Sequence, residues 1–247
     1  MDKMRFLRQG ETGLVVEFGN EIEPAVNTRV HSLSRRIASE YAQVIEAVVP
    51  TYRSFLVFFD PLLISRKELI EKIEETNAAM QSDTVDAVKT QTVIIPTLYG
   101  GEAGPDIEYV AKHNCLTVEE VIQIHTSVPY RIYMMGFTPG FPYLGGMSDE
   151  IATPRLNTPR TKIPAGSVGI AGSQTGLYPI ESPGGWQLIG RTPLKVFNPA
   201  SIDPFVYAAG DFLQFESISV AEYTRIQKDV EQGRYHLRTF PAKEVLG

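Results

Sequence analysis

Polar side chains suited to ligand binding gather in one stretch of the sequence, residues 136–193. Two arginines lie in TPRLNTPRTKIPAG, where prolines stiffen the chain. A guanidinium on a stiff loop suits bidentate capture of a carboxylate or phosphate, because less conformational entropy is lost when its fork is ordered. The alternative is structural, with these arginines forming surface ion pairs or holding loop carbonyls. The polar set is Arg155, Arg160, Lys162, Gln174, Glu181, Gln187 and Arg191.

Several familiar catalytic motifs are missing from the sequence. It has no GxxxxGK[ST] phosphate loop, no GxGxxG after a strand and no GxSxG nucleophile elbow. His31, His113, His125 and His236 lie far apart, so we expect no metal site. His125 falls on the apolar stripe of an expected helix, which favours a satisfied, half-buried histidine over a general base.

The stretch GFTPGFPYLGG, residues 136–146, is apolar yet rich in Gly and Pro, which predicts a loop. Its side chains have two possible uses. Exposed aromatic residues on a rigid loop would form a binding surface, whereas buried ones would plug one end of the second domain as core. Both uses remain possible, and different side chains of the loop could serve each one. The residues concerned are Phe137, Phe141, Pro142 and Tyr143.

The elements that must position these residues fall into two parts. Residues 3–75 predict the order β, β, α, β, β, α, a self-sufficient α+β unit, with Ser65 and Glu68 forming a capping box before the second helix. Residues 76–90 are polar, small and aperiodic, which predicts a linker.

The second part begins with a strand in TQTVIIPTLYGG, followed by two short helices, the second capped by Thr117 and Glu120. From residue 128 onward, YRIYMM, VGIAG, WQLIG, LKVF and FLQF predict short strands between Gly- and Pro-rich turns, typical of a barrel or sandwich. GxxGxxG at 166–172 predicts bulges and tight corners, or else close approach to a ligand. Ser219 and Glu222 predict the start of a closing helix.

Composition limits the function classes. The formal net charge of −6 and pI near 5.3 argue against a nucleic-acid partner, which needs clustered cations. The first residues contain no apolar signal region, and no window approaches eighteen apolar residues, so we expect a cytoplasmic protein that is not inserted in a membrane. The single cysteine, Cys115, is expected to be a small buried residue.

Residues 133–197 resemble the signature block of a known family. GFTPGFPYLGGMS and PRLNTPRTKIPAGSVGIAGSQTGLYPIESPGGWQLIGRTPL are similar to the KipI family, which includes the 5-oxoprolinase B subunit and was formerly labelled as the first subunit of allophanate hydrolase. IPTLYGGEAGPDIEYVAKHNCLTVEEVIQIHTS resembles the preceding segment. The resemblance implies an α+β protein with a small KipI-type N-terminal domain, 1–85, and a cyclophilin-like β-barrel domain with flanking helices, 90–247.

The first function that the resemblance implies is enzymatic. Such a chain acts with A-type and C-type partner subunits to hydrolyse 5-oxo-L-proline to L-glutamate with ATP, at a site shared between subunits and without a metal in this chain. Phosphorylation would activate the stable lactam carbonyl, and we expect Arg155, Arg160 and Arg191 to stabilise the developing negative charge. We expect Lys162, Gln174 and Glu181 to bind substrate, Gln174 through the ring amide.

The second function that the resemblance implies is inhibitory. A KipI-type protein blocks autophosphorylation of a sensor histidine kinase by docking on its helical dimerisation region. Phe137, Phe141, Pro142 and Tyr143 would then form the docking surface, and the same residues would serve equally to bind a partner of the enzyme. Because metabolic subunits suit more kinds of cell, we favour the enzyme subunit.

Overall fold

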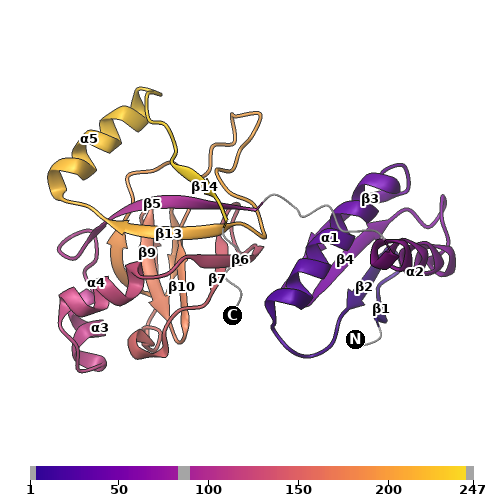
Figure 1. Ribbon diagram of the computed structural model, residues 1–247, viewed down its shortest axis with the longest axis horizontal. Coiled ribbons are helices and arrows are strands. Elements are labelled where there is room, and N and C mark those ends of the chain that lie inside the picture. The colour runs from indigo at the N-terminus through magenta and orange to yellow at the C-terminus, as the bar shows by residue number, and fades with distance from the viewer. Residues whose placement is uncertain (1–3, 83–89, 243–247) are drawn as a thin grey trace. The chain divides into compact units, whose positions relative to one another are not determined.

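The computed structural model describes residues 4–82 and 90–242, and the chain divides into two compact units, Met1–Lys89 and Thr90–Gly247. Figure 1 shows helices and strands in both, which confirms the α+β class. No helix in the described part of the chain is long and apolar enough to cross a membrane.

The first unit is a four-stranded antiparallel sheet with two helices on one face, in the strand order β1-β2-β4-β3. Alternate residues Phe55, Val57 and Phe59 of β4 are buried against the helices, as a half-covered strand requires. The expected element order is confirmed. The bounds are β1 Arg5–Gln9, β2 Gly13–Glu17, α1 Pro24–Glu40, β3 Ile45–Pro50, β4 Ser54–Phe59 and α2 Arg66–Ser82.

The linker expected over 76–90 is partly wrong, because α2 continues to Ser82. Thr76 is buried in this last part of the helix, and its hydroxyl lies 3.2 Å from the Tyr41 hydroxyl. Packing against the unit therefore extends the helix beyond the point where its apolar periodicity weakens. Residues 83–89 lie outside the described residues.

The second unit is built around a sheet in the order β10-β9-β12-β5-β13-β6-β7, and β10 approaches β7, so that the sheet nearly closes into a barrel. Strand β13 runs parallel to β5, and β14 also pairs with β5. In chain order the elements are β5 Gln91–Tyr99, α3 Ile107–His113, α4 Val118–Thr126, β6 Tyr130–Met135, β7 Pro142–Gly145, η1 Asp149–Ile151, β8 Arg160–Ile163, β9 Ser167–Ala171, β10 Gln174–Leu177, β11 Ser182–Gly184, β12 Gln187–Arg191, β13 Phe212–Ser217, α5 Val220–Glu231 and β14 Thr239–Pro241.

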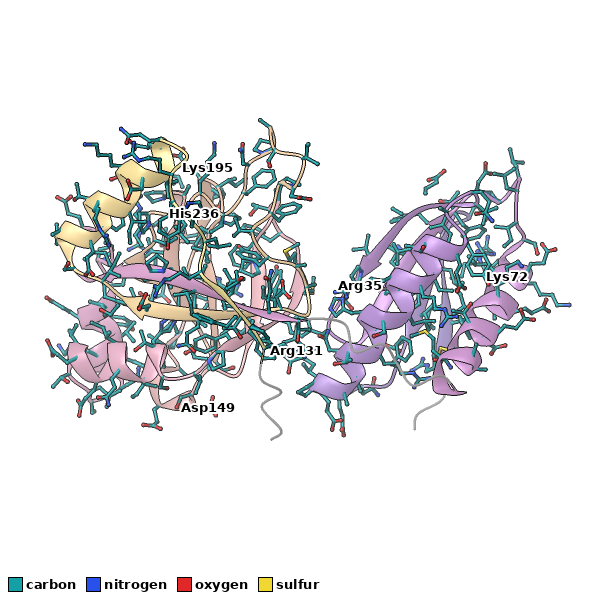
Figure 2. All side chains as sticks on the ribbon, turned by 45° about the horizontal axis from the view of Figure 1, so that its top comes forward. Arg35, Lys72, Arg131, Asp149, Lys195 and His236 are labelled. Carbon is teal, nitrogen blue, oxygen red and sulfur yellow. The ribbon has the colours of Figure 1, made fainter. Side chains whose placement is uncertain are left out.

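An apolar core fills the barrel and extends under α3, α4 and α5. Val93, Ile95 and Phe215 are buried inside it, whereas charged side chains such as Asp149 and Lys195 point outward (Figure 2). Both expected capping boxes of this unit are present, at the starts of α4 and α5. The barrel-type second part is thus confirmed.

Two local expectations in this unit are wrong. The end of GFTPGFPYLGG is not loop, because Pro142–Gly145 forms β7 against β6. Proline fits there as the first strand residue, where its missing N–H costs no ladder bond. Conversely, LKVF at 194–197 forms no strand and makes only the single bridge Phe197↔Phe205.

Candidate functional site

A cavity of about 290 Å³ opens between five aromatic rings and one arginine in the second unit. We call it the aromatic pocket, lined principally by Phe137, Phe141, Tyr143, Tyr178, Trp186 and Arg155. The residues come from the loop before β7, from β7 itself, from the 152–159 segment and from the segments that flank β11.

Phe141 is the centre of the pocket floor. Its ring centroid lies 5.3 Å from Tyr143, 5.3 Å from Tyr178 and 5.5 Å from Trp186, each in an edge-on arrangement. Edge-on contacts place the positive rim of one ring against the negative face of another. Phe141, Tyr178 and Trp186 are all buried, so the floor is a packed aromatic cluster rather than a flexible surface.

Glycines make room for these rings. A Cβ at Gly176 would lie 2.8 Å from the Trp186 ring, and one at Gly184 would collide with the Tyr178 hydroxyl. Gly169 and Gly172 of the GxxGxxG run have structural roles too: a Cβ at Gly169 would meet the Gln187 carbonyl at 2.9 Å, and Gly172 has φ +61°. These contacts favour the bulge-and-corner interpretation of that run.

Phe137 forms the exposed edge of the pocket. Its side chain is 63% exposed, and its ring stands edge-on to Phe141 at 5.6 Å. Its φ is +64°, a left-handed conformation that is unfavourable for a bulky residue. The following turn is fixed from outside, because the Tyr207 hydroxyl donates to the Gly140 carbonyl at 2.9 Å.

The four loop residues therefore divide between two uses, with some in the core and others on a possible binding surface. Phe141 and Pro142 are buried and belong to the core. Phe137 is exposed and Tyr143 is partly exposed, so these two present ring surface at the opening. We call Phe137, Tyr143 and Arg155 the rim of the pocket.

Arg155 is the cation of the aromatic pocket. Its guanidinium carbon lies 5.9 Å from the centroid of Trp186, in cation–π range, and the side chain is exposed to solvent. Burial raises the pKa of Tyr178 to about 12, and the positive charge of Arg155 opposes that rise. Tyr178 is therefore a neutral wall at physiological pH.

Arg160 links three neighbouring segments of the chain beside the pocket. It donates to Asp106 Oδ1 at 2.7 Å and to the Trp186 carbonyl at 3.3 Å, while Asp106 Oδ2 accepts from the Leu188 amide at 2.6 Å. This set joins β8 to the segment before α3 and to β12. Its geometry matches the structural alternative, in which the arginines form ion pairs and hold carbonyls.

The remaining polar candidates lie outside the pocket lining. Lys162 and Glu181 pair with each other at 3.0 Å, and both side chains are more than half exposed. Gln174 is partly buried on β10, and Arg191 on β12 affects Tyr223 of α5 electrostatically. The structure thus places Arg155 alone of the three candidate catalytic arginines in the pocket lining.

Sequence reasoning did not single out Tyr178 and Trp186 as pocket residues. Both closely follow glycines, in GLYP and GGWQ. A glycine before a large aromatic ring in a strand-rich region signals a close ring approach, and that signal would have pointed to them.

His125 is a structural residue of the barrel interior. It is fully buried rather than half-buried; Tyr99 Oη lies 2.7 Å from Nδ1, and Thr175 Oγ1 lies 2.7 Å from Nε2. Thr175 donates to the Gly169 carbonyl, which leaves its oxygen to accept from Nε2–H. Burial lowers the pKa of His125 to about 3, so the ring is neutral and satisfied.

Cys115 is exposed, which overturns the expectation of a buried residue. It follows the C-cap of α3 with φ +57°, and its amide donates to the Lys112 carbonyl. Its position is set by the need to end a helix rather than by the apolar character of its side chain. Among the described residues no group of three or more His, Cys, Asp and Glu side chains has a metal-binding arrangement.

The comparison with protein families gives one match over most of the chain. The model described as "Carboxyltransferase domain, subdomain C and D" covers residues 4–207. The chain belongs to this family. It is also 46% identical to the 5-oxoprolinase B subunit of Bacillus subtilis (strain 168) over 224 residues, which cover 87% of this chain and 92% of that protein.

A second relative and a solved structure extend this result. The 5-oxoprolinase B subunit of Escherichia coli O157:H7 is 37% identical over 217 residues, covering 87% of this chain and 96% of that protein. The resemblance to the B subunit of 5-oxoprolinase is therefore confirmed. The Kluyveromyces lactis urea carboxylase shares the fold with a TM-score of 0.77 at 20% identity, over 97% of this chain and 24% of that longer one.

Proposed function

We propose that this chain is a subunit of an ATP-dependent 5-oxoprolinase that hydrolyses 5-oxo-L-proline to L-glutamate together with partner subunits. The observation that carries the proposal is the 46% identity to a 5-oxoprolinase B subunit, over nearly the whole of both chains. The kinase-inhibitor alternative has no support among the relatives described above.

The aromatic pocket is the site we propose for the substrate. Its volume of about 290 Å³ suits a small ring. The Trp186 and Phe137 rings offer apolar faces to the methylene side of the lactam, and the Arg155 guanidinium offers a fork for one carboxylate or for a developing oxyanion. One cation among aromatic walls fits a ligand that carries one negative charge.

The other predicted site residues take lesser parts in this proposal. Arg160 positions Trp186 through the Trp186 carbonyl while Asp106 neutralises its charge. Lys162 and Glu181 could bind substrate only if their ion pair breaks. Breaking it costs little free energy, because an exposed ion pair contributes about 0–1 kcal/mol. Arg191 and Gln174 would reach a substrate only in a site larger than this pocket.

ATP would supply the phosphoryl group that activates the lactam carbonyl. The aromatic pocket offers a single guanidinium and no glycine-rich phosphate loop, so its residues fit one carboxylate and not a triphosphate. We therefore place ATP at a site completed by the A-type and C-type partner subunits, and this chain contributes substrate binding and charge stabilisation.

The rim of the pocket is also the contact that we propose for a partner of the enzyme complex. An exposed phenylalanine kept in a left-handed conformation is costly for an isolated protein, and it gains burial when a partner covers it. Phe137→Asp would weaken co-sedimentation with the partner subunits. Val220→Asp, at an equally exposed apolar position on α5, serves as the control.

The proposed function is tested by glutamate release. Purified A-type and C-type partners from the same source are incubated with 5-oxoproline and ATP, with and without this chain. We expect glutamate to form only when the chain is present. Equal release without it, or no release although the partners bind it, would remove the chain from this enzyme.

A further inference from the structure

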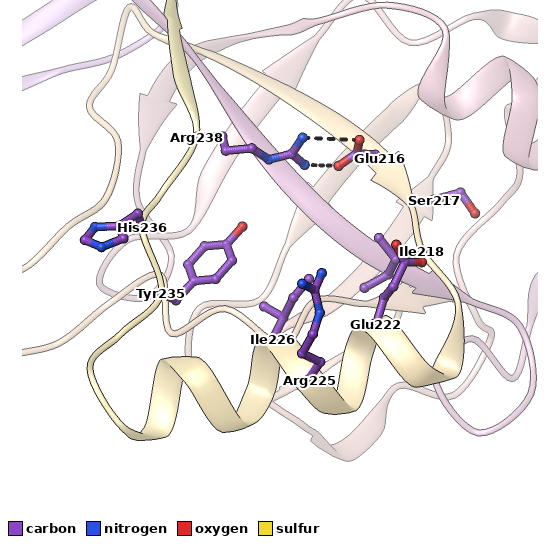
Figure 3. A pocket seen from close by; sticks show the side chains of 9 residues that line it. All are labelled: Glu216, Ser217, Ile218, Glu222, Arg225, Ile226, Tyr235, His236 and Arg238. Atoms are coloured by element: carbon purple, nitrogen blue, oxygen red, sulfur yellow. Dashed lines mark hydrogen bonds and ion pairs between the residues drawn. The ribbon is translucent and has the colours of Figure 1, made fainter.

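A second cavity, of about 360 Å³, lies beside α5, and none of the residues of the aromatic pocket lines it. Figure 3 shows its walls: α5, the end of β13 and the segment that leads into β14. Ile226 anchors α5 to the core, being only 7% exposed, and most of the other side chains around the cavity are polar.

One pair of charges in this cavity is already matched. Glu216 of β13 and Arg238 form an ion pair with two contacts, which Figure 3 shows across the upper part of the cavity. The same contact with Glu216 raises the pKa of Arg238. These two groups therefore hold the cavity wall in place and leave little net charge there for a ligand.

Glu222 keeps a free acceptor facing the cavity. Its Oε2 accepts from both the amide and the hydroxyl of Ser219, at 2.9 and 2.8 Å, in the capping box that begins α5. These bonds lower the pKa of Glu222, so the carboxylate is ionised at neutral pH. Its Oε1 accepts no hydrogen bond from the described residues, which leaves a charged oxygen available.

Arg225 follows three residues later on the same face of α5. Both side chains extend from the helix into the cavity in Figure 3. The charge of Arg225 lowers the pKa of Glu222, yet neither an ion pair nor a hydrogen bond joins Arg225 to any described residue. The cavity thus presents one uncommitted positive group and one uncommitted negative oxygen, close but not paired.

We propose that this cavity binds a free α-amino acid in its zwitterionic form. The carboxylate of the ligand pairs with the Arg225 guanidinium, and its ammonium group donates to Glu222 Oε1. A simple anion would meet the Glu222 charge and a simple cation would meet Arg225, so only a ligand with both charges satisfies both groups. The volume leaves room for an amino-acid side chain and water.

The proposal is tested by isothermal titration calorimetry on the full chain. The probes are glycine and L-glutamate as zwitterions, and acetate and methylammonium as carriers of one charge each. We expect saturable binding of an amino acid and no saturable binding of acetate or methylammonium at the same concentrations. Because no turnover is measured, failure here leaves the proposed enzyme activity standing, and failure of that activity leaves this site standing.

Two variants identify the groups. Glu222→Gln removes the charge but retains a residue that also serves in a capping box, and Arg225→Gln retains helix propensity. Each variant is expected to weaken amino-acid binding about tenfold or more, the loss for one charge-assisted hydrogen bond. Lys228→Gln, an exposed change on the same helix outside the cavity, is expected to leave binding unchanged.

Three results would overturn the proposal. They are acetate binding as tightly as the amino acids, amino-acid binding that neither variant changes, and the absence of saturable binding of both amino acids to the folded protein. Circular dichroism of each variant confirms that α5 and the barrel remain folded, so that a loss of binding is not a loss of structure.

Discussion

The floor and the rim of the aromatic pocket come in part from one loop, yet their side chains are held in different ways. Phe141 is 2% exposed and contacts four other rings, whereas Phe137, four residues earlier, is 63% exposed and makes a ring contact with Phe141 alone among the described residues. Packing fixes the floor, while the backbone of Phe137 in the rim is held in a conformation that its own side chain disfavours. Stability therefore resides in the floor, and we expect binding to reside in the rim.

The largest loss of stability is expected when the Phe141 ring is removed from the floor of the pocket. Phe141→Ala should reduce the free energy of unfolding by about 3–5 kcal/mol, because it leaves a cavity between Tyr178 and Trp186. Urea unfolding followed by Trp186 fluorescence measures this, since the chain has a single tryptophan and it lies in the second unit. An equal loss for Phe137→Ala would erase the distinction between floor and rim.

The barrel interior next to the floor is expected to make stability depend on pH. The pKa of His125 is about 3 when folded and about 6.5 when unfolded, so between these values the unfolded state binds the extra proton. The contribution of His125 to the free energy of unfolding should be fully present above pH 6.5. It should fall as the pH decreases towards 3, by up to about 1.4 kcal/mol per pH unit.

Comparison with His125→Gln isolates the contribution of this histidine. The window from pH 6.5 to 5.5 is suitable, because Glu120 and Glu222, whose pKa values are lowered from 4.5 in the folded protein, take up protons in the unfolded state mainly below it. The variant should be less stable than the wild type above pH 6.5 and show a smaller slope in this window, so that the two free energies of unfolding converge as the pH falls. A slope that persists unchanged in the variant would show that another group causes it.

The contact between Asp106 and Arg160 lies beside the pocket, and its removal should have an effect on stability between those expected at the floor and at the rim. Asp106→Asn weakens the bonds to Arg160 and to the Leu188 amide, with an expected cost of about 1–3 kcal/mol. Arg160→Gln should cost a similar amount, measured by the same fluorescence transition. A normal unfolding midpoint together with lost turnover in Arg160→Gln would instead move Arg160 into the chemistry.

The smallest effect on stability is expected at the rim. A substitution there tests whether the change is stabilising or destabilising. Phe137→Gly should stabilise the second unit or leave it unchanged within about 1 kcal/mol, because glycine adopts φ +64° without strain. The same variant should weaken co-sedimentation with the partner subunits. Marked destabilisation would mean that the Phe137 ring is part of the folded core.

Much of the fold could be predicted because its signals are local. Alternation of buried and exposed residues in SFLVFF and the capping boxes at Thr117 and Ser219 depend only on neighbouring residues, and the structure contains all of them. The continuation of α2 past residue 75 could not be predicted, since it depends on packing between Thr76 and Tyr41, thirty-five residues apart.

The candidate site was predictable only in part, for the same physical reason. The sequence pointed to Arg155, Phe137 and Tyr143. It does not distinguish an arginine that faces a ligand from one that pairs with a carboxylate of the protein. Only the fold brings Asp106 to Arg160, across fifty-four positions, and leaves Arg155 beside Trp186. The difference between a binding and a structural arginine was therefore decided by long-range contacts.

The central claim is tested most directly by Arg155→Gln in the reconstituted enzyme. The substitution should change the free energy of unfolding by no more than about 0.5 kcal/mol, because Arg155 is exposed. Glutamate release should fall at least about 100-fold in kcat/KM, while Lys195→Gln, an exposed cation outside the pocket, retains full activity. Undiminished turnover of Arg155→Gln would contradict the assignment of the aromatic pocket as the substrate site.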